Sequence, residues 1–237
     1  MQASERNALD QARHLLGECV LFRGLSQKER TDLVGRARMR SFRAGQTIFL
    51  MGASGDSMMA VLDGTVRISV PSPEGKEIVL AIIQPGEVFG EIAVLDGKER
   101  TAEATAMTDC TLAVLERRDV MTFLESNPSG WPRLVDLLCA RLRHSDRQIA
   151  EMAFLQLPVR LAKALLRMAD MAAGLAGARA GARIRLTQRE LGNIVGMTRE
   201  SVNKCLREWQ RKGIIRIEDN EIVVVKRDAL EQVAHTG

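Results

Sequence analysis

Residues 86–101 read GEVFGEIAVLDGKERT, with a Gly-Glu pair near one end and an Arg-Thr pair at the other end of one short turn. Gly86 and Gly90 have no Cβ, so the backbone can approach a ligand closely and present its N–H groups. Arg100 carries a planar fork that matches two phosphate oxygens, and Thr101 adds a hydroxyl donor. Glu91 is an acceptor suited to a sugar hydroxyl. The segment therefore predicts a sugar-phosphate pocket, and the alternative is a surface hairpin with an ordinary Glu and Arg.

The sequence around this segment predicts strands. From Phe42 to about Glu116, β-rich runs such as TVRISV, EIVLAII and CTLAVLE are separated by turn glycines. Asp63-Gly64 and Asp96-Gly97 are typical tight-turn dipeptides. Short strands with turns at this spacing indicate a sandwich or barrel, so we expect a small jelly-roll-like domain flanked by helices. The turn glycines are Gly52, Gly64, Gly75, Gly86 and Gly97.

A long helix is predicted over about residues 132–155, after a shorter one near 118–126. Its apolar positions step by three and four, with one small polar member, Ser145. This pattern favours a coiled-coil interface between two chains, and the alternative is packing on the chain's own core. Ser145 suggests a ligand or register contact, because a buried hydroxyl needs a partner. The apolar positions are Val135, Leu138, Leu142, Ile149 and Met152.

The last third of the chain predicts a helix-turn-helix. Pro158 indicates a hinge and a new helix, and an Ala/Gly/Arg-rich loop is expected near residues 174–183. Thr187 and Glu190 form a capping-box pattern, Gly196 permits a tight turn, and Thr198 is suited to cap a second helix. The run IIRIEDNEIVVV, residues 214–225, then predicts a two-stranded wing around residues 219–220.

Basic side chains gather on this segment, which favours DNA over the alternative of a merely solvated face. Arg199, Glu200 and Lys204 share one face near the start of the second helix, where base edges are read. Arg can grip guanine and Glu can accept from cytosine. Phosphate contacts, which position without specifying sequence, are expected from three further residues. These are Arg189, Thr198 and Ser201.

Composition sets broader limits. The 237 residues are 46% hydrophobic and carry a formal net charge of +4, which suits two modest domains and a polyanionic partner. Scattered cysteines and isolated histidines predict reduced thiols and no metal site. No run approaches the ~20 apolar residues of a membrane span, and the first residues do not resemble a signal peptide, so we expect a cytoplasmic protein. The cysteines are Cys19, Cys110, Cys139 and Cys205, and the histidines are His14, His144 and His235.

Residues 86–101 resemble the phosphate-binding cassette of cyclic-nucleotide-binding domains. The whole chain is similar to the cAMP receptor protein branch of the CRP/FNR transcription regulators. The resemblance implies that Glu91 binds the ribose 2′-hydroxyl and that Arg100 and Thr101 bind the cyclic phosphate. It further implies that the backbone of Gly90, Glu91 and Ile92 lines the pocket.

The same resemblance extends to the long helix. Alignment without gaps from Asn127-Pro128 to residues 153–155 puts Ser145 and Asp146 at the base-contacting positions, with Arg141 one turn earlier. Asp146 departs from the family pattern, because cAMP-selective members usually have a second small hydroxyl residue there. A carboxylate accepts from adenine or guanine, so we hypothesise that cGMP also binds. The alternative is that Asp146 is a solvated charge.

The segment TRESVNKCL, residues 198–206, resembles the family's recognition helix and implies base contacts by Arg199, Glu200 and Lys204. Lys204 stands where close relatives usually have arginine. An altered base preference is therefore a further expectation.

Together these features predict an α+β chain with three parts. They are an N-terminal β-roll domain over residues 1–128, a dimerisation helix and hinge over 129–157, and a winged helix-turn-helix over 158–237. The predicted function is that of a homodimeric, allosteric transcription regulator that binds cAMP, possesses no enzymatic activity, recognises near-palindromic double-stranded DNA and contacts RNA polymerase.

Two rival interpretations remain open. One is a regulator of the same fold with a different effector or none. The other is an enzyme that cleaves phosphodiesters with Glu91 and Arg100, but no catalytic nucleophile, metal cluster or P-loop motif accompanies that pair.

Overall fold

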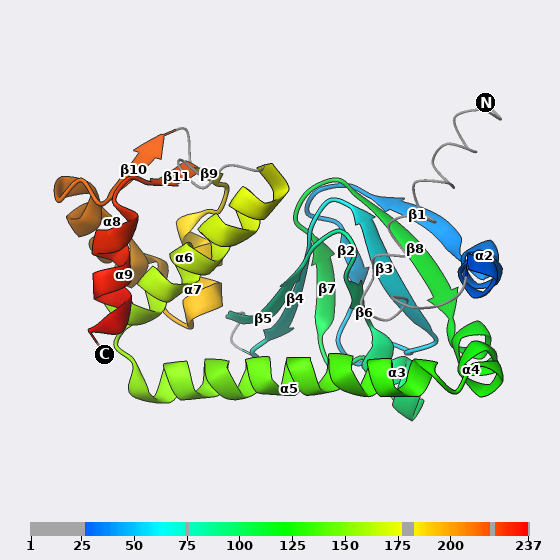
Figure 1. Ribbon diagram of the computed structural model, residues 1–237. Helices are drawn as coiled ribbons and strands as arrows, with labels where there is room; N and C mark the ends of the chain where they lie inside the picture. Colours follow the sequence, from blue (N-terminus) through cyan, green and yellow to red (C-terminus); the bar gives the residue numbers. More distant parts are fainter. Residues whose placement is uncertain (1–26, 74–75, 177–182, 219–220, 237) are drawn as a thin grey trace. The chain divides into compact units, whose positions relative to one another are not determined.

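The computed structural model describes residues 27–73, 76–176, 183–218 and 221–236 (Figure 1). The described residues form two compact units: those up to Pro71 with Leu80–Arg143, and Ser72–Val79 with those from His144 onward. Residues predicted at Cys19, His14, Gly75, the loop positions 177–182 and the wing turn 219–220 lie outside the described residues. No helix of the described part is long and apolar enough to cross a membrane.

The first unit is built on two four-stranded antiparallel sheets, which confirms the predicted β-roll. One sheet has the order β1-β8-β3-β6 and the other has the order β2-β7-β4-β5. The strands are β1 Arg38–Phe42, β2 Thr47–Phe49, β3 Ser57–Asp63, β4 Val66–Pro71, β5 Glu77–Ile83, β6 Val88–Phe89, β7 Glu103–Ala106 and β8 Cys110–Glu116.

Strand β3 explains how this unit is layered. Its run of apolar residues is buried on both faces, as in a strand covered on each side. Met59 and Val61 join the core cluster that contains side chains of both sheets. Met58 and Ala60 face the other way and pack with Leu124 and Leu134, so helices cover that face.

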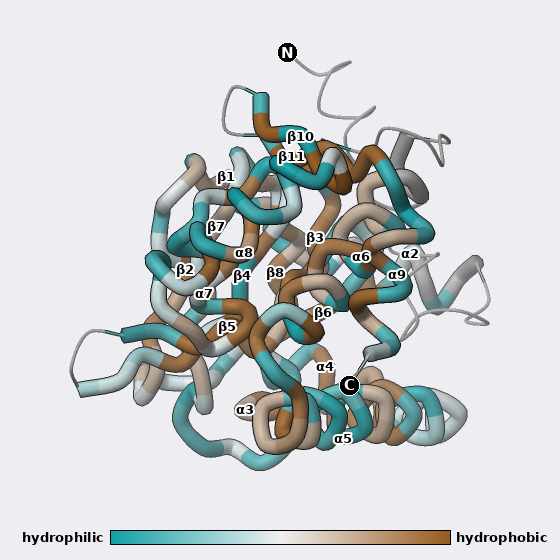
Figure 2. The backbone as a smooth tube through the Cα atoms, turned by 90° about the vertical axis from the view of Figure 1, so that its left-hand side faces the viewer, coloured by the Kyte–Doolittle hydropathy of each residue, from teal (hydrophilic) through white to brown (hydrophobic). Residues whose placement is uncertain are grey.

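Within the described residues, the sheets are accompanied by the helices α2 Gln27–Arg36, α3 Glu91–Asp96, α4 Arg117–Ser126 and the long α5 Gly130–Phe154. Helix α5 runs through both units and carries mixed polar and apolar residues along its length (Figure 2). Leu134 packs in the core, but Val135, Leu142 and Ile149 are 54%, 63% and 65% exposed. The predicted seam is therefore not covered by this chain's own core at those three positions.

The second unit contains the winged helix-turn-helix that the sequence predicts. Thr187 accepts from the backbone N–H of Glu190, and the Glu190 carboxylate accepts from the backbone N–H of Thr187, which completes the capping box of α7. Gly196 ends α7 at φ 66°, and Thr198 caps α8. The elements are α6 Leu157–Ala176, β9 Arg183–Ile184, α7 Gln188–Val195, α8 Arg199–Arg211, β10 Ile215–Glu218, β11 Glu221–Val224 and α9 Arg227–His235.

Several element boundaries differ from the prediction. Strand β1 begins at Arg38, before the Phe42 at which the sequence predicts the first strand. It is an exposed edge strand, so its residues before Phe42 give no apolar signal. The segment between Gly90 and Arg100, expected to be a short turn, contains helix α3. This helix buries Ala93 and Val94. Helix α6 continues to Ala176, inside the region expected to be a loop. The wing gains β9 as a third strand.

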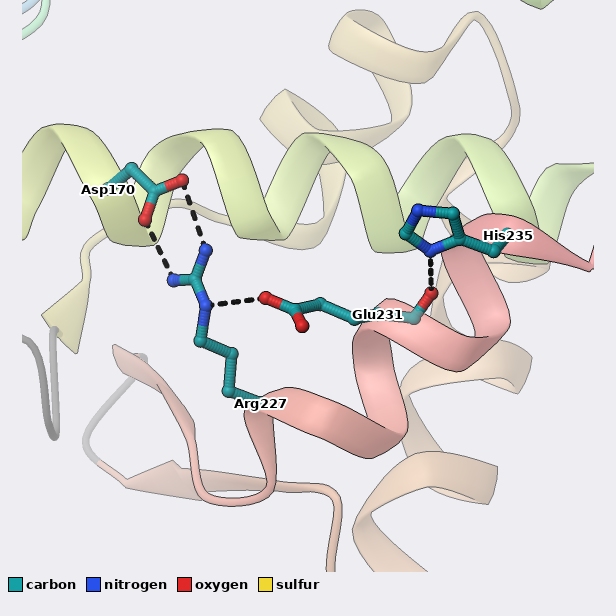
Figure 3. A network of polar contacts seen from close by, with 4 residues as sticks. All are labelled: Asp170, Arg227, Glu231 and His235. Atoms are coloured by element: carbon teal, nitrogen blue, oxygen red, sulfur yellow. Dashed lines mark hydrogen bonds and ion pairs between the residues drawn. The ribbon is translucent and has the colours of Figure 1, made fainter.

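Helix α9 was not predicted. It packs against α6, and Arg227 joins the two helices (Figures 1 and 3). The Arg227 guanidinium donates to both carboxylate oxygens of Asp170, at 2.7 and 3.2 Å, and to Glu231 at 2.7 Å. His235 Nδ1 lies 2.6 Å from the carbonyl oxygen of Glu231 and so closes the last turn of α9.

Candidate functional site

Arg100 is a buried cation within the first unit, with 5% of its surface exposed. Nη1 donates to the carbonyl oxygen of Gly90 at 2.9 Å, and Nη2 donates to Ser57 Oγ at 3.2 Å. Nε is buried and has no hydrogen-bond partner among the described residues. Burial lowers the pKa of Arg100, while the charges of Asp56 and Glu91 oppose that change. The guanidinium thus keeps an unused donor in a dry setting, where an anion would bind strongly.

The backbone around Arg100 is fixed by the turn that follows β2. Its N–H donates to the Ala53 carbonyl at 2.9 Å, and its carbonyl accepts from the Gly52 N–H at 2.8 Å. The guanidinium carbon lies 4.3 Å from the ring centroid of Phe49, the last residue of β2. Sequence reasoning missed Phe49 and Ser57, because neither belongs to the 86–101 segment.

Gly90 must be glycine for two reasons. Its φ is 79°, a left-handed conformation that L side chains rarely adopt. A Cβ at this position would lie 2.7 Å from Arg100 Nη1. The close approach of backbone predicted at Gly90 is therefore made to the protein's own guanidinium.

Glu91 opens helix α3 and is 1% exposed. Nη1 of Arg141, on α5, lies 2.9 Å from Glu91 Oε1, as an ion pair that is not aligned as a hydrogen bond. Arg141 also donates through Nη2 to the carbonyl of Val88. Burial raises the pKa of Glu91, and the charge of Arg141 is the largest opposing cause. Both carboxylate oxygens lack a hydrogen bond within the described part of the chain, so either could accept from a hydroxyl.

The structure thus brings together Gly90, Glu91, Arg100 and Arg141, and their role in binding a nucleotide stays a prediction. Ile92 and Thr101 flank this group and are exposed. Ser145 and Asp146 are exposed residues of α5 in the second unit. None of the described residues forms a cluster of three or more His, Cys, Asp or Glu side chains that could hold a metal ion.

Helix α8 presents the predicted DNA-reading residues. Arg199, Glu200 and Lys204 are exposed within its first two turns. Hydrogen bonds from the backbone N–H of Glu200 and from Thr198 lower the pKa of Glu200, so it is a carboxylate acceptor at neutral pH. Arg189 is exposed on α7, and Ser201 N–H donates to the capping Thr198 at 3.3 Å. A surface groove on α8 adds Asn203 and Gln210, which are polar residues without a charge signal in the sequence. The groove is lined by Glu200, Asn203, Lys204, Arg207, Gln210 and Arg211.

Two family models match the chain, one before helix α5 and one after it. Residues 39–127 match the cyclic nucleotide-binding domain, and residues 159–233 match the Crp-like helix-turn-helix domain. A Thermus thermophilus protein named cyclic AMP receptor protein is 31% identical, over 90% of this chain and 96% of its own length.

The chain belongs to the cAMP receptor protein family of transcription regulators.

The matches to two further members of this family extend over nearly the whole length of each relative. A CRP-like cAMP-activated global transcriptional regulator of Mycobacterium tuberculosis is 29% identical, over 93% of this chain and 98% of its own length. The crystal structure of a CRP/FNR-family transcriptional regulator from Thermus thermophilus superposes with a TM-score of 0.70 at 29% identity, covering 84% of this chain and 99% of that one. The chain is accordingly a cyclic-nucleotide-binding, DNA-binding regulator and not an enzyme.

Proposed function

We propose that this regulator is a homodimer whose affinity for DNA is controlled by cAMP bound beside Arg100 and Glu91. The observation that carries the proposal is the buried Nε of Arg100, which has no partner among the described residues. An unpaired buried donor on a cation is costly unless an anion completes it. A cyclic phosphate would supply that anion.

Glu91 supports a sugar beside the phosphate. Both buried oxygens of the Glu91 carboxylate lack a hydrogen-bond partner among the described residues, and a ribose hydroxyl would donate to one of them. The relatives named cAMP-activated regulators support adenosine as the nucleoside. The proposed ligand contacts are the backbone of Gly90, Glu91 and Ile92, the side chains of Glu91, Arg100, Thr101 and Arg141, and Ser145 and Asp146 for the base.

We propose cGMP as a second ligand because Asp146 is an exposed carboxylate at a base-contacting position of the family alignment. A carboxylate accepts from the exocyclic amine and ring N–H of guanine as well as from the adenine amine. An absence of cGMP binding at millimolar concentration would contradict this part of the proposal.

The proposed dimer uses the exposed apolar positions of α5, which one chain leaves open to solvent. Two α8 helices would then read successive major grooves of a near-palindromic site, about 34 Å apart. To move DNA-competent dimers from 1:99 to 99:1, the nucleotide must prefer that arrangement by about 5.5 kcal/mol.

We propose one function for each of the three predicted parts of the chain. Residues 1–128 bind the nucleotide, 129–157 form the dimer helix and hinge, and 158–237 bind DNA. RNA polymerase is the proposed partner on DNA, and the cytoplasm is the proposed location.

Titration calorimetry with cAMP and cGMP, followed by mobility shift on a degenerate DNA pool, tests the proposal. Arg100→Ala should abolish nucleotide-dependent DNA retention, and Arg100→Lys should weaken it because lysine lacks the two-pronged fork. Arg38→Ala, at an exposed position on β1, is the matched control. Far-ultraviolet circular dichroism confirms that each variant is folded. Equal DNA retention with and without nucleotide would refute the proposed switch.

A further inference from the structure

The aromatic ring of Phe49 contacts the Arg100 guanidinium in addition to the groups that are hydrogen-bonded to it. The guanidinium carbon is 4.3 Å from the centroid of the ring, which is within the range of a cation–π contact. Phe49 is in turn packed against Phe89, with ring centroids 5.9 Å apart and planes tilted by 34°. Phe89 is fully buried and directly precedes Gly90, whose carbonyl accepts from Arg100. The Phe49 ring therefore packs on the residue directly before Gly90, and the Gly90 carbonyl binds the guanidinium.

The groups that contact Arg100 are unusual for a buried cation. A carbonyl, a hydroxyl and an aromatic face contact it, and within the described part of the chain no carboxylate lies within ion-pair distance of it, although the charges of Asp56 and Glu91 act on it from farther away. A carboxylate contact would fix the side chain but would also neutralise the charge that an anionic ligand needs. An aromatic face attracts the cation through its quadrupole and leaves the net charge in place.

We propose that Phe49 is a positioning residue for the nucleotide phosphate. Its ring holds the Arg100 guanidinium in place without cancelling the positive charge. The inference rests on the proposed nucleotide site and adds a residue to it from outside the 86–101 segment. Phe49 does not need to touch the ligand, because it acts through the orientation of Arg100.

The chain provides a matched comparison at Phe42. Its ring also lies under an arginine, with the Arg40 guanidinium carbon 5.2 Å from the centroid. Phe42 is 4% exposed and belongs to the same core cluster that Phe49 packs against. Arg40, however, is an exposed residue of the edge strand β1 and has no place in the nucleotide site. A change at Phe42 therefore reproduces the packing effect without the electrostatic effect on Arg100.

The sharpest test replaces Phe49 with mono-, di- and trifluorophenylalanine by site-specific incorporation. Fluorine withdraws charge from the ring face and weakens the cation–π contact with little change in shape. We expect the Kd for cAMP to rise stepwise, reaching roughly a threefold to tenfold increase for the trifluoro ring. The same series at Phe42 should leave the Kd unchanged, while both series have similar thermal unfolding midpoints.

Two conventional variants and a spectroscopic signal complete the experiment. Phe49→Leu should weaken cAMP binding, and Phe49→Tyr should retain it because the ring is kept. In the ligand-free protein, ring current should shift the Arg100 Hε resonance upfield, and Phe49→Leu should abolish that shift. A purely structural role for Phe49 would not produce the stepwise fluorine effect.

The outcomes separate this inference from the proposed function. Normal cAMP binding that does not change across the fluorinated series at Phe49 would overturn the positioning role and leave the nucleotide site standing. A parent protein that binds neither cAMP nor cGMP would overturn both.

Discussion

Arg141 Nη1 lies 2.9 Å from Glu91 Oε1, which connects the long helix α5 to the first residue of α3. Glu91 is 1% exposed, whereas the side chain of Arg141 retains 30% exposure. The pair is therefore asymmetric: the carboxylate depends on the arginine for its charge, but the arginine is partly solvated without it.

Removal of this arginine should make stability depend more strongly on pH. The pKa of Glu91 is raised above the value of 4.5 for an exposed glutamate, so its contribution to stability is present below pH 4.5 and is lost as the pH rises through the folded-state pKa. Arg141→Gln removes the main opposing charge and should raise that pKa further. We expect the variant to lose about 1–3 kcal/mol of unfolding free energy at pH 7.

Chemical denaturation at a series of pH values checks this prediction. The difference between parent and Arg141→Gln should shrink as the pH is lowered towards 4, because Glu91 is then protonated in both proteins. A difference that stays constant over the range would show that Arg141 acts through packing alone.

Gly90→Ala should damage both stability and nucleotide binding. The variant must adopt a φ of 79° and place a Cβ 2.7 Å from Arg100 Nη1. Gly86→Ala is the matched control, since its φ is 86° but its Cβ would meet nothing within 4 Å. Both should lose about 1–2 kcal/mol from backbone strain, and Gly90→Ala should lose a further 1–3, approximately, from the clash. Equal unfolding free energies for the two variants would contradict the close approach.

Ile149→Asp should convert the proposed dimer to monomers. Ile149 is 65% exposed on α5, and a carboxylate in an apolar two-chain seam would face its own copy and repel it. Arg147→Glu alters charge at another exposed α5 position, outside the three-and-four pattern, and should remain dimeric. Sedimentation equilibrium distinguishes the two states. A parent protein that is already monomeric at micromolar concentration would end the dimer proposal.

Glu200→Ala and Arg189→Ala should change DNA binding in different ways. Loss of the Glu200 acceptor should relax sequence preference at one base pair by about 1–3 kcal/mol. Loss of the proposed Arg189 phosphate contact should weaken binding to all sequences and reduce the slope of log K against log salt by about 1. Binding to single-substituted operators at several salt concentrations measures both effects. The assignments would be reversed if Arg189→Ala changed sequence preference instead.

Local signals in the sequence determined much of this protein. The capping box of Thr187 and Glu190 and the cap at Thr198 depend on residues three apart, so their spacing alone locates the helix-turn-helix. The alternating and continuous apolar runs likewise located the β-roll, and the 86–101 segment located Glu91 and Arg100. Helix α9 escaped prediction because its packing against α6 and its Arg227–Asp170 contact join residues 57 apart in sequence.

Tertiary structure alone decided the surroundings of the two charged pocket residues. Ser57 contacts Arg100 across 43 residues of sequence, and Phe49 contacts Arg100 from a still earlier position. Arg141 likewise contacts Glu91 from a distant part of the chain. The residue types alone indicated that Glu91 could supply a negative charge and Arg100 a positive charge, because charge is a property of the side chain itself. Burial, and the neighbours that burial brings, determined that Arg100 retains an unpaired donor and that Glu91 has a raised pKa.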